Sequence, residues 1–590
     1  MNTKVRMASI AAGTLLVAGV LGILIHRRAA RWRFLRSMEA EVRYTLTAPR
    51  GDIYDANGDV IATSKDVYDV HLDCAIIQGE AEWKEKTLDL APQLAAMFPE
   101  RGAAEWWDYL QDGRNKNKHY LRIAKGISPE KKDSLARLPV FDMRPLEGGA
   151  IYESYQVRVY PYDSLARRVI GYSLPGGERR IGIEGRWDAD LRGTDGYSVY
   201  KYNRMEGRGH MKETERVEAV AGMDVHTTLS MPIQMRADSA LRSVLNGDED
   251  LESGCLILME VHTGAIRAMV NLSKGKRNYD SGKAWERYNH AIASSYEPGE
   301  VLQTMTLASV LRDGYKQSLD EVVPTSHGIL PDYPQDRHLV DYERSRGTDR
   351  ISLKEGLALS SKYVFGKLAT EYYSGSELYY TEGIGDWCLP DGFDFDVLGF
   401  RKVIMTNPEG PYWKGSTLPS LANGHAMVMT PLDILSFYNT IANRGTMVQP
   451  YLVEAVQRGK GTYYQHMTGV LKAHAMALAV ADTLSRALRY VTTDGTGRRL
   501  QDAKVPIAGK TGTSRQILNP YDEHGLAEAP YHDKEGRWKT ASTYAGFFPA
   551  DDPRYSVVCV LFSYPCQKTF FGGTYAGRVV KDLVNTLEFK

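Results

Sequence analysis

The pattern of hydrophobic and polar positions predicts strands in several parts of the chain. Apolar and polar residues alternate over 68–73 and again over 224–230, as they do in a half-buried strand. Residues 255–259 form a continuous apolar run, and 265–269 form a second run after a short turn, so the two predict a buried hairpin. Asn57-Gly58 lies between two short apolar stretches and predicts another hairpin turn.

Other stretches have the spacing of helices. Residues 81–143 have mostly the pattern of polar amphipathic helices, in which tryptophans would be the packing anchors. Glu297-Pro298-Gly299 predicts a turn that starts a helix, because Pro is favoured in the first helical turn, where its missing N–H is not needed. Apolar residues then recur at helical spacing over 305–311. A further helix is predicted over 431–444, ended by Gly445.

The N-terminal region predicts a membrane anchor. Residues 7–25 form an unbroken run of apolar and small residues, and about 20 such residues are needed to cross a bilayer. A cleaved signal peptide is the alternative, but arginines crowd the small pair Ala29-Ala30, which favours an uncleaved anchor with a cytoplasmic tail over 1–30. More arginines follow this run than precede it, so the positive-inside rule by itself would place the rest of the chain in the cytoplasm.

Composition narrows the choice of functions. The 590 residues are enough for two or three domains. The 73 basic and 73 acidic residues cancel, which gives no basis for a nucleic-acid partner. The five cysteines are few and scattered, so neither a disulfide framework nor a metal motif is visible, and we expect no cofactor. Cys559 and Cys566 could pair across a hairpin, although free thiols are the simpler interpretation.

Several short strings occur in order along the chain: Arg50-Gly51-Asp52-Ile53, Arg158-Val159-Tyr160-Pro161, Gly182-Ile183-Glu184, Thr493-Asp494-Gly495-Thr496-Gly497 and Lys510-Thr511-Gly512-Thr513. Together they resemble the class B penicillin-binding proteins, the membrane-anchored transpeptidases of bacterial cell-wall synthesis. The resemblance covers about residues 40–590 and is closer to the division-type branch. It implies an α+β multidomain protein: an anchor, an extended mixed pedestal or dimerisation-type domain over 40–222, and a penicillin-binding transpeptidase domain over 223–590. That last domain would have a central antiparallel sheet with helices on both faces.

The resemblance also implies serine-type acyl transfer on D-alanyl-D-alanine stem peptides, with Ser-x-x-Lys, Ser-x-Asn and Lys-Thr-Gly supplying the catalytic groups. This chemistry needs a nucleophile, a base, an oxyanion hole and a group that holds the terminal carboxylate. Here Glu300 is at the nucleophile position and Gln303 is at the base position. A glutamine amide cannot act as a base near neutral pH. Other Ser-x-x-Lys strings, at 128–131 and 273–276, lie outside the position of the motif.

The second motif is half present and the third is intact. Ser360 is retained, but Lys362 replaces the Asn. Lys362 could stand in for the missing base, yet position 300 would still have no hydroxyl to activate. The residues that the resemblance assigns to substrate binding and the terminal carboxylate are all present: Lys510, Thr511, Gly512 and Thr513.

We therefore expect a division-associated component of peptidoglycan synthesis that has lost transpeptidation. The resemblance implies a single-pass protein of the inner membrane with its large part in the periplasm, against the charge rule. It also implies a SEDS-type glycosyltransferase and other cell-wall synthesis proteins as partners, and non-covalent binding of stem peptides at Lys510 and Thr511. The alternative is an active D,D-transpeptidase whose active-site residues are altered or were changed artificially. The polar loop 514–539 could cover the cleft or contact a partner.

Overall fold

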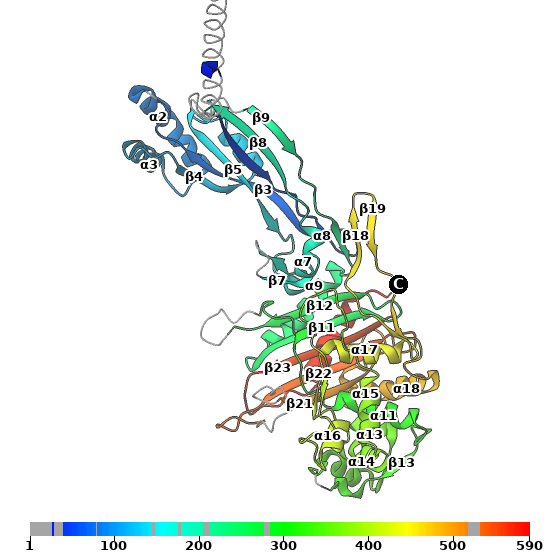
Figure 1. The fold of residues 1–590 in the computed structure, drawn as a ribbon. Helices are drawn as coiled ribbons and strands as arrows, with labels where there is room; N and C mark the ends of the chain where they lie inside the picture. The colour runs from blue at the N-terminus through cyan, green and yellow to red at the C-terminus, as the bar shows by residue number, and fades with distance from the viewer. Residues whose placement is uncertain are drawn as a thin grey trace, which may run out of the picture. The chain divides into compact units, whose positions relative to one another are not determined.

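The computed structural model describes residues 26–28, 39–77, 79–143, 148–174, 179–203, 212–275, 284–331, 333–516 and 531–589. They form two compact units (Figure 1). Unit 1 contains the chain up to Gly51, Thr63–Val159 and Arg192–Met223, and unit 2 contains Asp52–Ala62, Tyr160–Leu191 and the chain from Asp224. Two stretches that the sequence prediction assigned to the pedestal domain, 52–62 and 160–191, thus belong to unit 2.

The predicted membrane span, 7–25, lies outside the described residues. Within the described ranges, no helix combines the length and the apolar character needed to cross a membrane.

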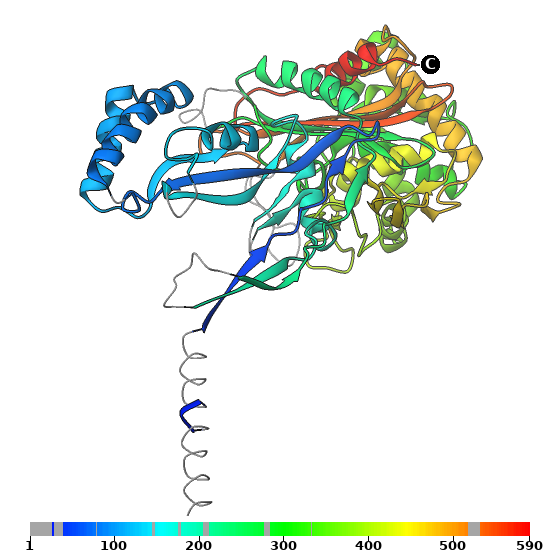
Figure 2. The same ribbon diagram turned by 90° about the horizontal axis from the view of Figure 1, so that it is seen from above.

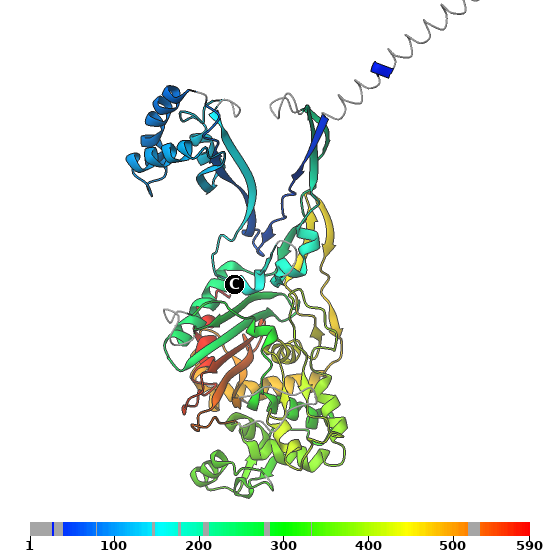
Figure 3. The same cartoon turned by 60° about the vertical axis from the view of Figure 1, so that its left-hand side comes forward.

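Unit 1 has a sheet covered by helices. The part of β3 (Val60–Leu72) from Thr63 onward pairs antiparallel with β4 (Leu121–Ile127) and β5 (Ala150–Val159). The helices are α2 (Glu80–Met97), α3 (Ala103–Asn115) and α4 (Pro129–Leu135), of which α2 and α3 pack together (Figure 3). Trp83 and Trp106 are fully buried in this core, as the sequence predicts.

The helical prediction over 81–143 missed one strand. Leu121–Ile127 is β4, in which Leu121 and Ile123 face the core while Arg122 between them is exposed. The pairing with β3 stabilises this short stretch as a strand, which the local pattern between two helices did not reveal. A separate antiparallel sheet of unit 1 has the order β1 (Glu39–Leu46), β8 (Gly196–Asn203), β9 (Lys212–Val217).

The centre of unit 2 is a five-stranded sheet in which every neighbouring pair is antiparallel. Its order is β12 (Ile266–Ser273), β11 (Leu251–Glu260), β23 (Tyr555–Ser563), β22 (Lys539–Phe548), β21 (Ala508–Gln516). The predicted hairpin of 255–259 and 265–269 is the β11–β12 pair. The predicted antiparallel sheet is therefore confirmed. Cys559 and Cys566 are free thiols.

Helices cover both faces of this sheet (Figure 2). α9 (Met231–Asn246) and α19 (Ala576–Thr586) pack on each other and share one apolar core with alternate residues of β11 and β23. α17 (Pro431–Ala442) packs on the opposite face, and α18 (Leu478–Asp494) contacts α17 and β21. Because neither face meets water, β11 has a continuous apolar run instead of an alternating pattern.

A second group of helices brings the catalytic positions to the β21 edge. The 3-10 helix η2 (Gly299–Leu302) contacts β21 and continues as α11 (Gln303–Arg312). α14 (Lys362–Tyr373) packs on α11 and α16 (Thr417–Ala422), and α13 (Leu353–Leu359) packs on α18. The helix predicted after Pro298 is therefore present, with a first turn of 3-10 type.

The other elements of unit 2 are short. Its helices are α6 (Arg167–Ile170), α7 (Gly182–Arg186), α8 (Asp188–Leu191), α10 (His290–Ala293), η3 (Ser326–Gly328), α12 (Arg337–Arg346), α15 (Glu377–Gly385) and η4 (Arg498–Leu500). Its strands are β2 (Ile53–Tyr54), β6 (Tyr172–Ser173), β7 (Arg180–Ile181), β10 (Asp224–Thr227), β13 (Val322–Pro324), β14 (Arg350–Ser352), β15 (Ile404–Met405), β16 (Met427–Val428), β17 (Met447–Val448), β18 (Val453–Arg458), β19 (Gly461–Gln465) and β20 (Val470–Lys472). The predicted Asn57-Gly58 turn joins β2 to β3.

Candidate functional site

A glycine contact fixes the turn before Glu300. Gly299 and Gly424 both have positive φ, +66° and +77°, and the N–H of Gly299 donates to the carbonyl of Gly424 at 3.0 Å. A Cβ on Gly424 would lie 1.9 Å from the Gly299 oxygen, so only glycine permits this approach. Gly512 of β21 also lies close to the turn, since a Cβ there would be 2.9 Å from the Pro298 oxygen. The turn is thereby held against β21.

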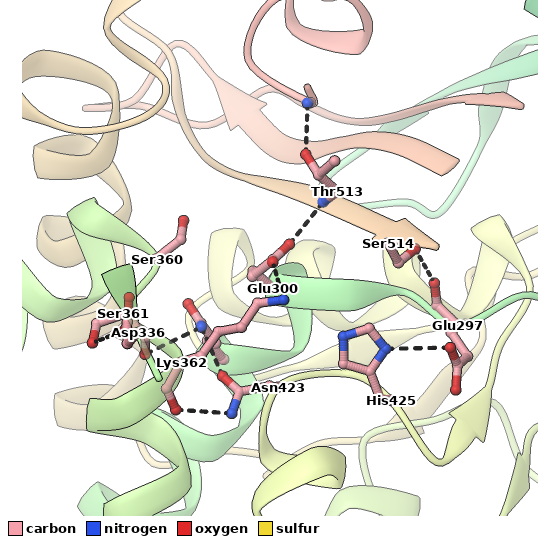
Figure 4. A network of polar contacts seen from close by, with 12 residues as sticks. Glu297, Glu300, Asp336, Ser360, Ser361, Lys362, Asn423, His425, Thr513 and Ser514 are labelled. Carbon is pink, nitrogen blue, oxygen red and sulfur yellow. Dashed lines mark hydrogen bonds and ion pairs between the residues drawn. The ribbon is translucent and has the colours of Figure 1, made fainter. Parts of the chain in front are cut away.

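This packing places the Glu300 carboxylate between a strand and a helix (Figure 4). Its Oε2 accepts a hydrogen bond of 2.7 Å from the backbone N–H of Thr513 in β21. Its Oε1 lies 3.3 Å from Nζ of Lys362, the first residue of α14. The Glu300 side chain is only 10% exposed, whereas that of Lys362 is 41% exposed. Each oxygen of this carboxylate therefore has a polar partner, one from β21 and the other from α14.

The end of α14 that holds Lys362 is itself anchored. Ser361 caps the helix by accepting from the N–H of Val364 at 3.2 Å, and its hydroxyl donates to Asp336 at 2.7 Å. Asp336 also accepts from the N–H of Tyr363 at 3.1 Å. A cation in the first turn of a helix is disfavoured by the helix dipole. Glu300 offsets that cost for Lys362.

The charges around Glu300 keep it ionised. Burial by itself would raise its pKa, but the charges of Lys362 and Lys510 and the Thr513 hydrogen bond outweigh it, so the pKa lies below the usual value. Glu300 in turn raises the pKa of Lys362, against the effect of burial. The opposite charges at positions 300 and 362 therefore stabilise each other.

Gln303 occupies the base position without a basic group. It is fully buried, and its Nε2 donates to Asn423 Oδ1 at 2.9 Å and more weakly to the Ser361 carbonyl at 3.4 Å. Asn423 also donates to the carbonyls of Lys362 and Pro419, at 3.0 and 2.8 Å. Gln303 thus ties α11 to the loop after α16 and to the start of α14.

Lys510, the lysine of the Lys-Thr-Gly motif in β21, is fully buried. Its Nζ donates to Ser360 Oγ at 2.6 Å and to the Thr511 carbonyl at 2.9 Å. Ser360 is held in the left-handed region, at φ 59°. Burial lowers the pKa of Lys510 to about 7, although the Glu300 charge opposes this. Among the predicted binding residues, Thr511 bonds Thr496 at 2.7 Å, and Thr513 accepts from the N–H of Gly572.

The structure therefore brings the predicted positions of all three motifs together: Glu300, Gln303, Ser360, Lys362, Lys510, Thr511 and Thr513. Gly512 packs against the turn that precedes Glu300. The other Ser-x-x-Lys serines are structural, because Ser128 caps α4 and Ser273 ends β12. Sequence reasoning missed Asp336 and Asn423. Asn423 directly precedes Gly424, whose backbone carbonyl bonds Gly299, but no local signal pointed to Asp336.

Because Lys510 is buried, we expect the stability of the folded protein to depend on pH. Between pH 7 and the usual Lys value of 10.5, the unfolded chain binds a proton that folded Lys510 does not. Stability should therefore rise with pH in this window, by up to about 1.4 kcal/mol per pH unit. Urea unfolding at pH 7, 8 and 9 should show this rise for the wild type relative to the Lys510→Met variant. Equal pH dependence of the two proteins would contradict it.

Family profiles match most of the chain. The penicillin binding protein transpeptidase domain matches residues 254–585, and the penicillin-binding protein dimerisation domain matches residues 45–227. The penicillin-binding protein PbpB of Mycolicibacterium smegmatis is 25% identical, over 91% of this chain and 82% of its own length. The stage V sporulation protein D of Bacillus subtilis is 23% identical, over 91% of this chain and 77% of its own length.

Solved structures show the same fold. Penicillin binding protein 2X of Streptococcus thermophilus superposes with a TM-score of 0.69 at 19% identity, covering 92% of this chain and 79% of that one. Penicillin binding protein 3 of Mycobacterium tuberculosis, in complex with aztreonam, gives a TM-score of 0.60 at 20% identity, covering 92% and 96%. With both domain profiles matched in order on a two-domain fold of this type, the chain belongs to the family of class B penicillin-binding proteins.

Proposed function

We propose that this chain serves bacterial peptidoglycan synthesis as a penicillin-binding protein that does not itself cross-link stem peptides. The observation that carries the proposal is the ion-paired carboxylate of Glu300 at the nucleophile position, with Gln303 at the base position. A nucleophile must offer a reactive electron pair. Here one oxygen is bound by Thr513 and the other is paired with Lys362.

The chemistry of a carboxylate nucleophile argues in the same direction. Attack by Glu300 on an amide would give a mixed anhydride, which is much higher in energy than the ester that a serine forms. The lowered pKa of Glu300 means that the anion is stabilised in place, and that stabilisation is lost if the oxygen attacks. The site is thus built to hold Glu300 and not to react through it.

The remaining role is that of a partner in the cell-wall machinery. We infer a single-pass anchor over 1–30 in the inner membrane, with the pedestal over 40–222 and the transpeptidase-like domain over 223–590 in the periplasm. A SEDS-type glycosyltransferase of the division apparatus is the partner class, contacted through the anchor and pedestal. The relatives support the part of this proposal that concerns peptidoglycan synthesis, among them the probable peptidoglycan D,D-transpeptidase PenA of Neisseria meningitidis, 23% identical over 96% of this chain.

One observation favours an active enzyme as a second candidate. Ser360 Oγ lies 2.6 Å from Lys510 Nζ, and the lowered pKa of Lys510 makes part of its amine neutral near pH 7. A hydroxyl beside a neutral amine can be an acyl-transfer nucleophile. Against this, the inward N–H of Thr513, a potential oxyanion donor, is already taken by Glu300.

A fluorescent penicillin separates the two candidates. We expect no covalent band on the purified wild-type protein, because position 300 has no hydroxyl. A band that competes with unlabelled penicillin and disappears in Ser360→Ala would establish the second candidate. The site of any adduct is located by mass spectrometry of the digested protein.

A further inference from the structure

Each oxygen of Glu300 has a donor of its own. Lys362 Nζ lies 3.3 Å from Oε1, and the N–H of Thr513 lies 2.7 Å from Oε2. These two donors, here called the anion cradle, come from α14 and β21. Figure 4 shows them converging on the carboxylate from the two elements. The arrangement is that of a receptor with a bound carboxylate, except that the carboxylate belongs to the same chain.

The lysine side chains near Glu300 favour a carboxylate at its position. Lys510 is close enough to lower the pKa of Glu300, so two lysines act on one carboxylate. Removing that carboxylate would leave Lys362 without its ion-pair partner and the Thr513 N–H without its acceptor. Partly buried donors that lack a partner also cost free energy, so the empty cradle would favour an anion. The 41% exposure of the Lys362 side chain lets solvent reach the cradle from outside.

We propose that Lys362 and the backbone N–H of Thr513 form a carboxylate-binding site that Glu300 occupies as an intramolecular ligand. A small external carboxylate binds there when the Glu300 side chain is removed or displaced. The C-terminal carboxylate of a peptide has this chemistry. The inference rests on the proposed function only in that Glu300 is an occupant of the site and not a nucleophile.

The geometry selects carboxylates over simple halides. Two donors on separate elements each bind a different oxygen, which matches the two oxygens of one planar carboxylate. Chloride offers a single acceptor centre, which the two donors would have to share. A tethered ligand also has a high effective concentration, so Glu300 excludes dilute external carboxylates from the wild-type cradle.

The test compares acetate with chloride at equal ionic strength. For Glu300→Ala at pH 7.5, sodium acetate should raise Tm by about 2–4 °C over sodium chloride, with saturation. The wild type should show no difference between the salts. Glu300→Ala/Lys362→Met should also show none, because half of the cradle is gone. Gln303→Ala is a matched control, since it opens space beside the cradle without removing Glu300.

Each outcome decides the inference. A folded Glu300→Ala that responds alike to acetate and chloride would overturn it, and so would a full acetate response in the Lys362→Met double variant. If Glu300→Ala does not fold, Glu300→Ser takes its place in the same comparison. The proposed function is tested separately by penicillin labelling of the wild type. Labelling of the wild type together with an acetate response of Glu300→Ala would reject that function while supporting the cradle.

Discussion

The triple variant Glu300→Ser/Gln303→Lys/Lys362→Asn is expected to form a covalent adduct with a fluorescent penicillin, whereas we expect none on the wild type. Labelling should exceed that of the wild type by about 100-fold or more, because a hydroxyl and its base are both restored. The measurement is the in-gel fluorescence of purified proteins after a fixed incubation, normalised to protein.

The site has the geometry that this reversal needs. A lysine amine at position 303 can donate to the oxygens that Gln303 Nε2 now meets, those of Asn423 and Ser361. Serine at 300 releases the Thr513 N–H, which then points at the reaction centre instead of at a carboxylate. Asparagine at 362 removes a cation that would have lost its partner.

The matched control keeps every charge of the triple variant and lacks only the hydroxyl: Glu300→Ala/Gln303→Lys/Lys362→Asn. It should stay unlabelled. Glu300→Ser alone should also stay unlabelled, because position 303 still has no amine; a band on this variant would show that Lys362 serves as the base. If the triple variant is folded, with a Tm near that of the wild type, and still takes no label, the cleft differs from an active one at more than these three positions.

A double-mutant cycle should show that Glu300 and Lys362 stabilise each other. Lys362→Met should lower the free energy of unfolding by about 1–3 kcal/mol. This loss is smaller than for a fully buried ion pair, because solvent partly screens Lys362. Glu300→Gln should lower the free energy of unfolding by less, since Lys362, the partner that remains, is 41% exposed. The double variant should cost about 1–2 kcal/mol less than the sum of the two single costs. Urea unfolding at pH 7 gives the four values.

A second ion pair of unit 2 provides the control cycle. Lys472 is 39% exposed, close to Lys362, but its partner Asp386 is 71% exposed. Its coupling should be below about 1 kcal/mol, because both charges meet water. Equal coupling in the two cycles would contradict the role given to the buried Glu300. The Glu300 coupling should also fade in acid, since a carboxylate with a lowered pKa stabilises the fold only above that pKa.

The pairing changes how the departures from the family motifs are understood. From the sequence, Glu300 and Lys362 are two separate losses. In the structure they form one ion pair, and a change at either position leaves a charge without its partner. Serine at 300 alone or asparagine at 362 alone is therefore expected to be destabilising, and penicillin labelling is expected to require both changes together with Lys at 303.

Local pattern by itself determined much of this protein. The continuous apolar run of β11, the Asn57-Gly58 turn and the helix after Pro298 follow from hydrophobic spacing and turn chemistry, which act over a few residues. The motif positions were also available from sequence, including the absence of a hydroxyl at 300. The β4 strand could not be predicted from local pattern, because its stability depends on pairing with β3.

Only the tertiary structure decided what the substituted residues do. The Thr513 N–H that binds Glu300 lies 213 positions away in the chain, and Lys510 meets Ser360 across 150 positions. Such contacts depend on how closely η2, α14 and β21 approach, which Gly299, Gly424 and Gly512 permit. The charge state of a buried group is set by these neighbours and by the loss of water, so residue type at a position could not predict it.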